Sequence, residues 1–206
     1  AVPFFLTSVV GKKRLQADQT HETADLTEIA AGAGASAAAG ITASVIRNQE
    51  AQKAAPGTLT AYLSGNVIPL KEVGDGVFSE GIMGDGLAMI PENDTLYAPA
   101  DATVSVLMQD SRHACGLTLD NGTEILLHIG IDTVDMKGDG FEYLVSEGQK
   151  VSAGTPLIRF DRAKIKAAGH PDTTVCIITE PGAAENIRFV TGIKGEANKT
   201  VIATFE

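Results

Sequence analysis

The chain has 206 residues, which is enough for one sizeable domain and a tail without disulfide support. Its formal net charge of −10 arises after residue 56, because residues 1–56 carry five basic and five acidic side chains and the remainder carries 11 and 21. This charge argues against nucleic acid and anionic membrane surfaces as partners and favours a partner with a cationic face.

The first ten residues are apolar apart from one threonine and one serine, and the basic run Gly11-Lys12-Lys13-Arg14 follows them. A membrane-spanning helix needs about 20 apolar residues, so this run is too short to span by itself. Basic residues after an apolar run reverse the order of a signal peptide and are typical of the cytoplasmic end of a membrane helix. We interpret residues 1–15 as the end of a membrane segment; a floppy N-terminal tail is the alternative.

Residues 16–56 are rich in alanine, glycine, serine and threonine with little apolar periodicity, which predicts a flexible linker. From residue 57 onward, short apolar and β-branched runs are separated by glycine, proline and Asp-Gly turns. We expect ten strands, at 59–70, 86–90, 95–98, 102–108, 115–119, 125–131, 156–160, 175–179, 187–190 and 201–205. They predict an all-β fold, an antiparallel sandwich or barrel, with one short helix at 162–168 and a second helical turn near 141–145.

The hairpin over residues 111–134 brings two of the four histidines together. If Asn121 and Gly122 form a two-residue turn, Cys115 lies opposite His128 and His113 lies opposite Gly130. The two imidazoles then share a sheet face, about 7–8 Å apart at Cβ. A three-residue loop would reverse the parity and separate them.

Strict alternation along 124–131 places one apolar set on a core face, namely Ile125, Leu127, Ile129 and Ile131. His128 then points to the other face between Leu126 and Gly130, where the missing side chain of Gly130 leaves room beside the ring. A neutral imidazole there could attack an electrophile with one nitrogen while a hydrogen bond fixes the other. His113 would stabilise the charge of a transferring group. The alternative is that both histidines are ordinary polar residues on a half-buried face.

Four segments carry a resemblance to a known family: FSEGIMGDGLAMIP (78–91), APADATV (98–104), HIGIDTVDMKGDGF (128–141) and SEGQKVSAGTPLIRFD (146–161). They resemble the IIA domain of the glucose superfamily of the bacterial phosphoenolpyruvate-dependent sugar phosphotransferase system, over residues 56 to 206. The resemblance implies a duplicated hybrid motif of antiparallel strands and a phosphotransferase component without a cofactor. It also implies that His128 accepts phosphate from the phosphocarrier HPr and passes it to a cysteine of a IIB domain, with His113 as the second active-site histidine.

The resemblance assigns further positions one by one. Ser111 stands where the family usually has threonine and keeps its hydroxyl, and the Gly130 carbonyl is the expected partner of the non-phosphorylated nitrogen of His128. Asp75 and Asp132 resemble the carboxylates that meet a cationic HPr surface. The apolar docking patch is expected at Val77, Phe78, Met83, Leu126 and Val134, for which simple core packing is the alternative.

The resemblance also bears on the front of the chain, because permeases of this class place a membrane IIC domain, a linker and a IIA domain in this order. Residues 1–15 resemble the last membrane segment of such a IIC domain. We therefore expect residues 57–206 to be the IIA domain of a fused β-glucoside- or sucrose-type permease. This domain is expected in the cytoplasm, tethered by residues 16–56 to the inner face of the membrane.

The sequence leaves two alternative functions and predicts the state of the cysteines. A zinc hydrolase on a related β fold is the main alternative, but catalytic zinc usually has three protein ligands and the histidine pair supplies two, which leaves adventitious zinc at His113 and His128. A swinging-arm carrier using Lys137 is the other, although that lysine reads better as a solvated loop residue. Cys115 and Cys176 are expected to be free thiols, packed as small hydrophobes in the reducing cytosol.

Overall fold

The computed structural model describes residues 57–206. The predictions for the membrane segment at 1–15 and the linker at 16–56 lie outside the described residues. Within 57–206, no helix is both long enough and apolar enough to cross a membrane.

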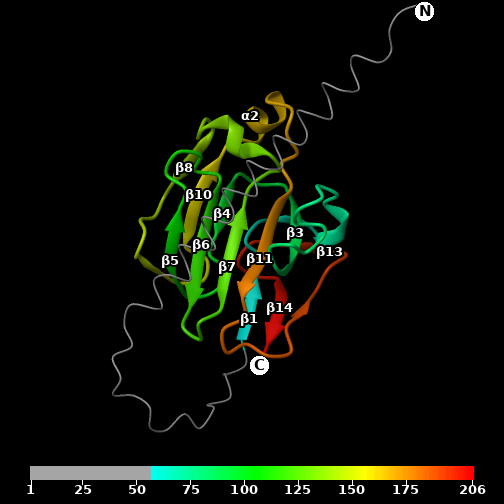
Figure 1. Ribbon diagram of the computed structural model, residues 1–206, viewed down its shortest axis with the longest axis vertical. Coiled ribbons are helices and arrows are strands. Elements are labelled where there is room, and N and C mark those ends of the chain that lie inside the picture. The colour runs from blue at the N-terminus through cyan, green and yellow to red at the C-terminus, as the bar shows by residue number, and fades with distance from the viewer. Residues whose placement is uncertain (1–56) are drawn as a thin grey trace, which may run out of the picture.

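The regular structure of the described chain is mostly antiparallel strands, which form three sheets (Figure 1). The central sheet has eight strands in the order β13-β2-β3-β11-β7-β6-β5-β9: β13 (Ile193–Gly195), β2 (Gly65–Pro69), β3 (Asp85–Pro91), β11 (Thr174–Glu180), β7 (Glu124–His128), β6 (Ala114–Leu119), β5 (Ala102–Leu107) and β9 (Lys150–Val151). The two smaller sheets are β1 (Gly57–Thr60), β14 (Val201–Phe205) and β12 (Arg188–Phe189), and β4 (Thr95–Tyr97), β10 (Pro156–Phe160) and β8 (Phe141–Tyr143).

The all-β prediction is confirmed, with local differences. The single strand expected at 59–70 is two strands, β1 and β2, separated by a bend, and the helical turn expected near 141–145 begins as strand β8. The short strands β9 and β13 were not predicted, because two or three residues show no alternation. The predicted helix is α2 (Arg162–Ala167), which begins where the Asp161 side chain accepts hydrogen bonds from the first free amides, an ordinary N-cap.

Both faces of the central sheet are covered. The main core lies between this sheet and the two smaller ones, and it includes Leu117 and Leu127 from the centre together with Ile158 and Ile202 from the small sheets. A second, smaller cluster lies on the opposite face beneath the segment that joins β2 to β3, which contains the 3-10 helix η1 (Leu70–Glu72). The candidate site lies against this second cluster.

Strand β7 carries His128 toward the end of the molecule that holds α2, whereas β1, β14 and the C terminus lie at the other end (Figure 1). The chain after β7 contacts the chain after α2. The Ile131 amide donates to the Pro171 carbonyl (3.1 Å), and His170 pairs with Asp135 on the 3-10 helix η2 (Thr133–Met136) at 2.8 Å.

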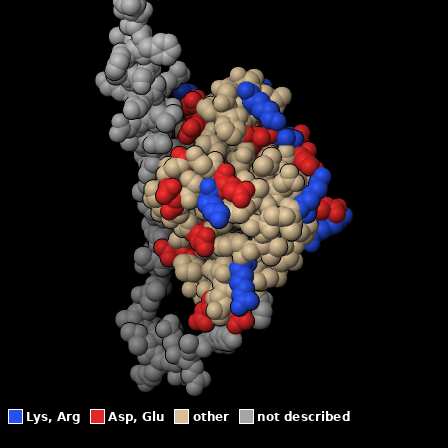
Figure 2. Space-filling model, turned by 90° about the vertical axis from the view of Figure 1, so that its right-hand side faces the viewer, with Lys and Arg blue, Asp and Glu red and all other residues tan. Residues whose placement is uncertain are grey.

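Charged side chains of both signs are interspersed on the face seen in Figure 2. The net negative charge of this part of the chain is therefore not gathered into one patch on that face.

Candidate functional site

The β6–β7 hairpin has a register one residue away from the predicted one. Ala114, not Cys115, lies opposite His128. The predicted position of His113 opposite Gly130 is wrong for the same reason, because every pair along the two strands moves by one residue.

The register follows from a three-residue loop, 120–122, where a two-residue turn was expected. The Leu119 amide donates to the Thr123 carbonyl (2.9 Å), which makes these two residues the closing pair. Gly122 has a φ of 81°, the left-handed position that ends a common three-residue hairpin loop. The Asn121 side chain accepts a hydrogen bond from the Thr123 amide (3.1 Å), so it supports the loop from within.

The two imidazoles nevertheless meet. Their ring centroids lie 4.5 Å apart with an interplanar angle of 84°, so one ring is edge-on to the other. The expectation that a three-residue loop would separate them is wrong, because His113 precedes β6 and strand alternation does not apply to it. Arg112, just before it, has a φ of 55°, so the backbone is left-handed, not extended, directly before His113.

His128 is fully buried, and its Nδ1 lies 2.9 Å from the Gly130 carbonyl oxygen. A carbonyl only accepts, so Nδ1 of a neutral ring carries the proton and Nε2 carries the lone pair. Gly130 has a φ of 76°, and a Cβ there would lie 2.4 Å from the Thr133 Cγ2. The backbone that orients the imidazole is therefore one that glycine adopts readily.

His113 is also fully buried. Burial, followed by the electrostatic effect of His128, holds the pKa of His113 well below its usual 6.5. The His113 ring is therefore neutral near pH 7, and it lies in contact with the His128 ring.

The second apolar cluster covers the histidines. Phe78 is 1% exposed and its ring centroid lies 5.0 Å from that of His128. Of the expected docking residues, Val77, Phe78 and Leu126 are buried in this cluster and Met83 packs against it. These residues lie beside His128 as expected, but they are packed in a core cluster beneath the β2–β3 segment, and their docking role stays a prediction. Ile131 also lies in this cluster rather than with Ile129 in the main core, because the left-handed turn at Gly130 ends the alternation.

The remaining predicted residues lie around this cover. The Asp75 carboxylate accepts hydrogen bonds from the Phe78 and Ser79 amides (both 2.9 Å), so it shapes the turn that carries Phe78. Asp132, with a φ of 59°, begins η2, and Val134 lies half-buried on it. Ser111 is buried in the loop just before His113, and its role stays a prediction.

Ile82 was not among the predicted residues, yet it is the most exposed large apolar side chain of the described chain, at 65%. It lies in the turn between Gly81 and Gly84, next to Met83. A large apolar residue inside a glycine-flanked turn, where it does not pack in a core, is the sequence signal that could have identified Ile82 as a candidate contact residue.

The cysteines are both buried, and burial raises the pKa of Cys115 and of Cys176 to about 12. A thiol of this kind is no nucleophile at neutral pH. Within residues 57–206, no group of three or more histidine, cysteine, aspartate or glutamate side chains is placed to hold a metal ion. His170, which is distant from His113 and His128 in the sequence, pairs with Asp135.

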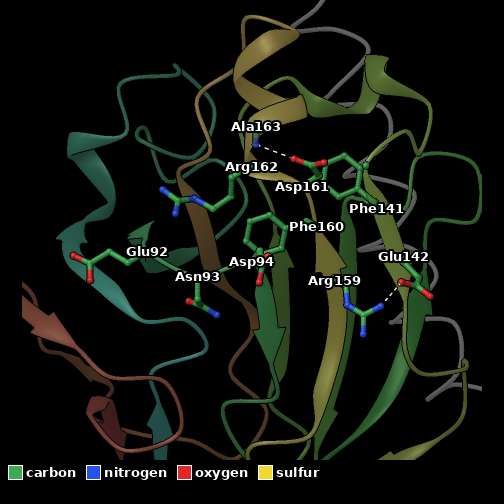
Figure 3. Close-up of a pocket in the computed structure, with 11 residues that line it drawn as sticks. Glu92, Asn93, Asp94, Phe141, Glu142, Arg159, Phe160, Asp161, Arg162 and Ala163 are labelled. Atoms are coloured by element: carbon green, nitrogen blue, oxygen red, sulfur yellow. Dashed lines mark hydrogen bonds and ion pairs between the residues drawn. The ribbon is translucent and has the colours of Figure 1, made fainter.

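A cleft of about 720 Å³ lies elsewhere, beside α2 and the ends of β8 and β10 (Figure 3). None of the predicted site residues lines it. Three of its charged groups are paired or used within the fold: Arg159 pairs with Glu142, Arg162 pairs with Asp172, and Asp161 caps α2. The histidine pair, not this cleft, is the candidate site.

Comparison with known proteins agrees with this geometry. Residues 57–183 match the family described as phosphoenolpyruvate-dependent sugar phosphotransferase system, EIIA 1. The chain is 41% identical over 145 residues to the PTS system glucose-specific EIIA component of Bacillus cereus, covering 70% of this chain and 87% of that protein. It also matches the solved glucose permease IIA from Mycoplasma capricolum with a TM-score of 0.66 and 32% identity, covering 73% of this chain and 96% of that one.

Fused relatives match as well. The PTS system glucose-specific EIIBCA component of Corynebacterium glutamicum is 41% identical over 144 residues, and the β-glucoside-specific EIIBCA component of Bacillus subtilis is 45% identical over 117 residues. The chain spans about a fifth of the length of these fused proteins, 21% and 19%. The chain belongs to the EIIA 1 family and contains a phosphocarrier domain of the glucose type, a component of the sugar phosphotransferase system.

Proposed function

We propose that His128 accepts a phosphoryl group on Nε2 from phosphorylated HPr and passes it to a cysteine of a IIB domain. The single observation that carries this proposal is the hydrogen bond from Nδ1 to the Gly130 carbonyl, because it leaves the lone pair on Nε2. In the transfer, the Nε2–phosphorus bond forms as the donor's bond to phosphorus breaks. The proton on Nδ1 stays in place.

His113 is proposed to stabilise the transferring group. Its ring is neutral and in contact with that of His128, so an N–H can face phosphoryl oxygens without a second positive charge beside the nucleophile. Ser111 supplies a hydroxyl to the same loop. No metal or cofactor has a part in this proposal, and zinc bound by the two histidines would be adventitious.

Docking is proposed on the face formed by the β2–β3 segment and η2. Ile82 offers an exposed apolar contact there, Asp75 lies in the β2–β3 segment and Asp132 begins η2, so this face also carries carboxylates for a cationic partner. Because His128 is buried, transfer requires its Nε2 to become accessible when the donor docks, and we propose that the neighbouring Phe78 ring moves to allow this.

The fused relatives support a further proposal for the parent protein. We expect residues 57–206 to act as a cytoplasmic domain joined through residues 16–56 to a IIC membrane domain that ends at residues 1–15. A tether raises the local concentration of this domain at its IIB partner without any new contact.

The test is incubation of the chain with phosphoenolpyruvate, enzyme I and HPr, followed by mass spectrometry. One acid-labile phosphate is expected on the peptide that contains His128. His128→Ala should remove it, whereas His113→Ala should accept phosphate but fail to pass it on to IIB. His21→Ala is the matched control, because His21 precedes the region that matches the family, and this variant should behave as the unchanged chain. Full phosphorylation of His128→Ala would overturn the assignment.

A further inference from the structure

The loop between β5 and β6, residues 108–114, carries Ser111 and His113, and one side chain from another sheet joins its two ends. The Met108 amide donates to the Tyr143 hydroxyl oxygen at 2.8 Å. The same hydroxyl lies 2.5 Å from the Ala114 carbonyl oxygen and 3.2 Å from the Met108 carbonyl oxygen.

The hydrogen bonds of this hydroxyl can be assigned from its chemistry. A phenol has one O–H, so its shorter contact, to the Ala114 carbonyl, receives the proton. The Met108 carbonyl has its own donor, the Arg112 amide at 2.7 Å, which closes the turn inside the loop. The Tyr143 hydroxyl thus takes one hydrogen bond from the start of the loop and gives one to its end.

Ala114 links this contact to the site. It follows His113 directly and lies opposite His128 on β7, while the His113 carbonyl accepts from the Ile129 amide at 2.9 Å. Tyr143 belongs to β8 in the β4-β10-β8 sheet, so its hydroxyl contacts the loop from another sheet, and it lies 29 residues after Ala114 in the sequence. The loop is therefore held on one side by β7 and on the other by Tyr143.

We propose that Tyr143 is a positioning residue for phosphoryl transfer. Its hydroxyl fixes the ends of the 108–114 loop, and this keeps the His113 ring edge-on to His128. The inference rests on the proposed function in giving this pair the chemistry, but the placement of His113 by Tyr143 is testable without phosphate.

The first measurement is the ring nitrogen and carbon-bound proton resonances of His113 in the unphosphorylated chain. Tyr143→Phe keeps the aromatic ring and removes only the hydroxyl. Tyr97→Phe is the matched control, because Tyr97 is also half-buried and lies on β4, the other outer strand of the same sheet. The His113 resonances should shift in Tyr143→Phe and stay in place in Tyr97→Phe. Equal spectra for the two variants would overturn the proposal.

The second measurement separates positioning from a general loss of structure. Small misplacements of reacting groups cost up to about 100-fold in rate, so we expect onward transfer to IIB to fall at least about 10-fold in Tyr143→Phe while His128 still accepts phosphate. In the His113→Ala background, the slow residual transfer to IIB should fall little further when Tyr143→Phe is added, because both changes act through one group. Full additivity of the two losses would refute the role.

The placement of His113 by Tyr143 can be tested even if the proposed function fails or the Tyr143→Phe variant does not fold. If the unchanged chain takes no phosphate, the resonance comparison still decides whether Tyr143 places His113. If Tyr143→Phe does not fold, 3-fluorotyrosine at position 143 keeps the ring and hydroxyl but makes the hydroxyl a stronger acid. It should then shift the His113 resonances, and unchanged resonances would count against the proposal.

Discussion

Replacement of Gly130 by alanine tests the backbone that orients the candidate nucleophile. Gly130 has a φ of 76°, and its carbonyl oxygen lies 2.9 Å from the His128 Nδ1. An added Cβ would lie 2.4 Å from the Thr133 Cγ2 and 3.1 Å from the Pro171 carbonyl oxygen. Both neighbours are hydrogen-bonded: Thr133 is fully buried and its hydroxyl donates to the Ile129 carbonyl at 2.6 Å, and the Pro171 carbonyl accepts from the Ile131 amide at 3.1 Å.

Two costs add. An L-residue in the left-handed region costs about 1–2 kcal/mol. Forcing a methyl group against a buried side chain that cannot turn without losing its hydrogen bond costs about 1–3 kcal/mol more. We therefore expect Gly130→Ala to lower the free energy of unfolding by about 2–5 kcal/mol. For a domain of this size, that corresponds to about 5–15 °C in Tm.

The assay is denaturant or thermal unfolding of the purified chain, compared with Gly192→Ala. Gly192 has a φ of 75°, but a Cβ there meets nothing within 4 Å, so this control carries the backbone cost alone, about 1–2 kcal/mol. Gly130→Ala should also weaken the Nδ1–H signal of His128 in NMR spectra, and Gly192→Ala should not. Equal losses of stability in the two variants would refute the close-contact argument.

Three further predictions follow from buried ionisable groups. Burial lowers the pKa of His113, so below pH 6.5 the unfolded chain binds more protons than the folded chain. The free energy of unfolding should therefore decrease as the pH falls below 6.5, by at most about 1.4 kcal/mol per pH unit, until the pH reaches the pKa of His113 in the folded chain. In urea titrations, His113→Ala should remove this slope. Burial, and then the charge of Glu180, raises the pKa of Glu124, so the contribution of Glu124 to stability is present below pH 4.5 and lost as the pH rises. Glu124→Gln should therefore raise the free energy of unfolding by less than about 1 kcal/mol at pH 7 and should not raise it at pH 4. Cys115 and Cys176 should resist iodoacetamide at pH 8 until the chain is unfolded in urea, and labelling of the native protein would contradict their burial.

Much of the fold is predictable because its signals are local. Short apolar and β-branched runs between turn residues located the long strands β3, β6, β7 and β11 to within a few residues, and the helix expected at 162–168 is α2. Strand alternation also placed His128 on the face away from the main core. It did not show that this face is covered, because the cover comes from the β2–β3 segment, whose glycine-rich turns have no periodicity of their own.

The contact between Tyr143 and the 108–114 loop has no local signal at all. A tyrosine on a short edge strand reads as an ordinary β residue, and its partners lie 29 and 35 positions earlier in the chain. Only the packing of one sheet against another places the hydroxyl between Met108 and Ala114. Positioning residues of this kind are found from coordinates rather than from spacing.

The histidine pair shows why a correct site can follow from a wrong register. The two-residue turn put His113 and His128 on one face by parity, and the observed three-residue loop reverses that parity along β6 and β7. The rings meet because His113 lies outside β6, directly after the left-handed residue Arg112, so strand alternation does not fix the direction of its side chain. Two departures from regular structure thus offset each other, and each lies in a loop, where backbone conformation depends on single residues. The geometry of this site is consequently more sensitive to changes in the 108–114 and 120–122 loops than to apolar substitutions of similar volume in the strands.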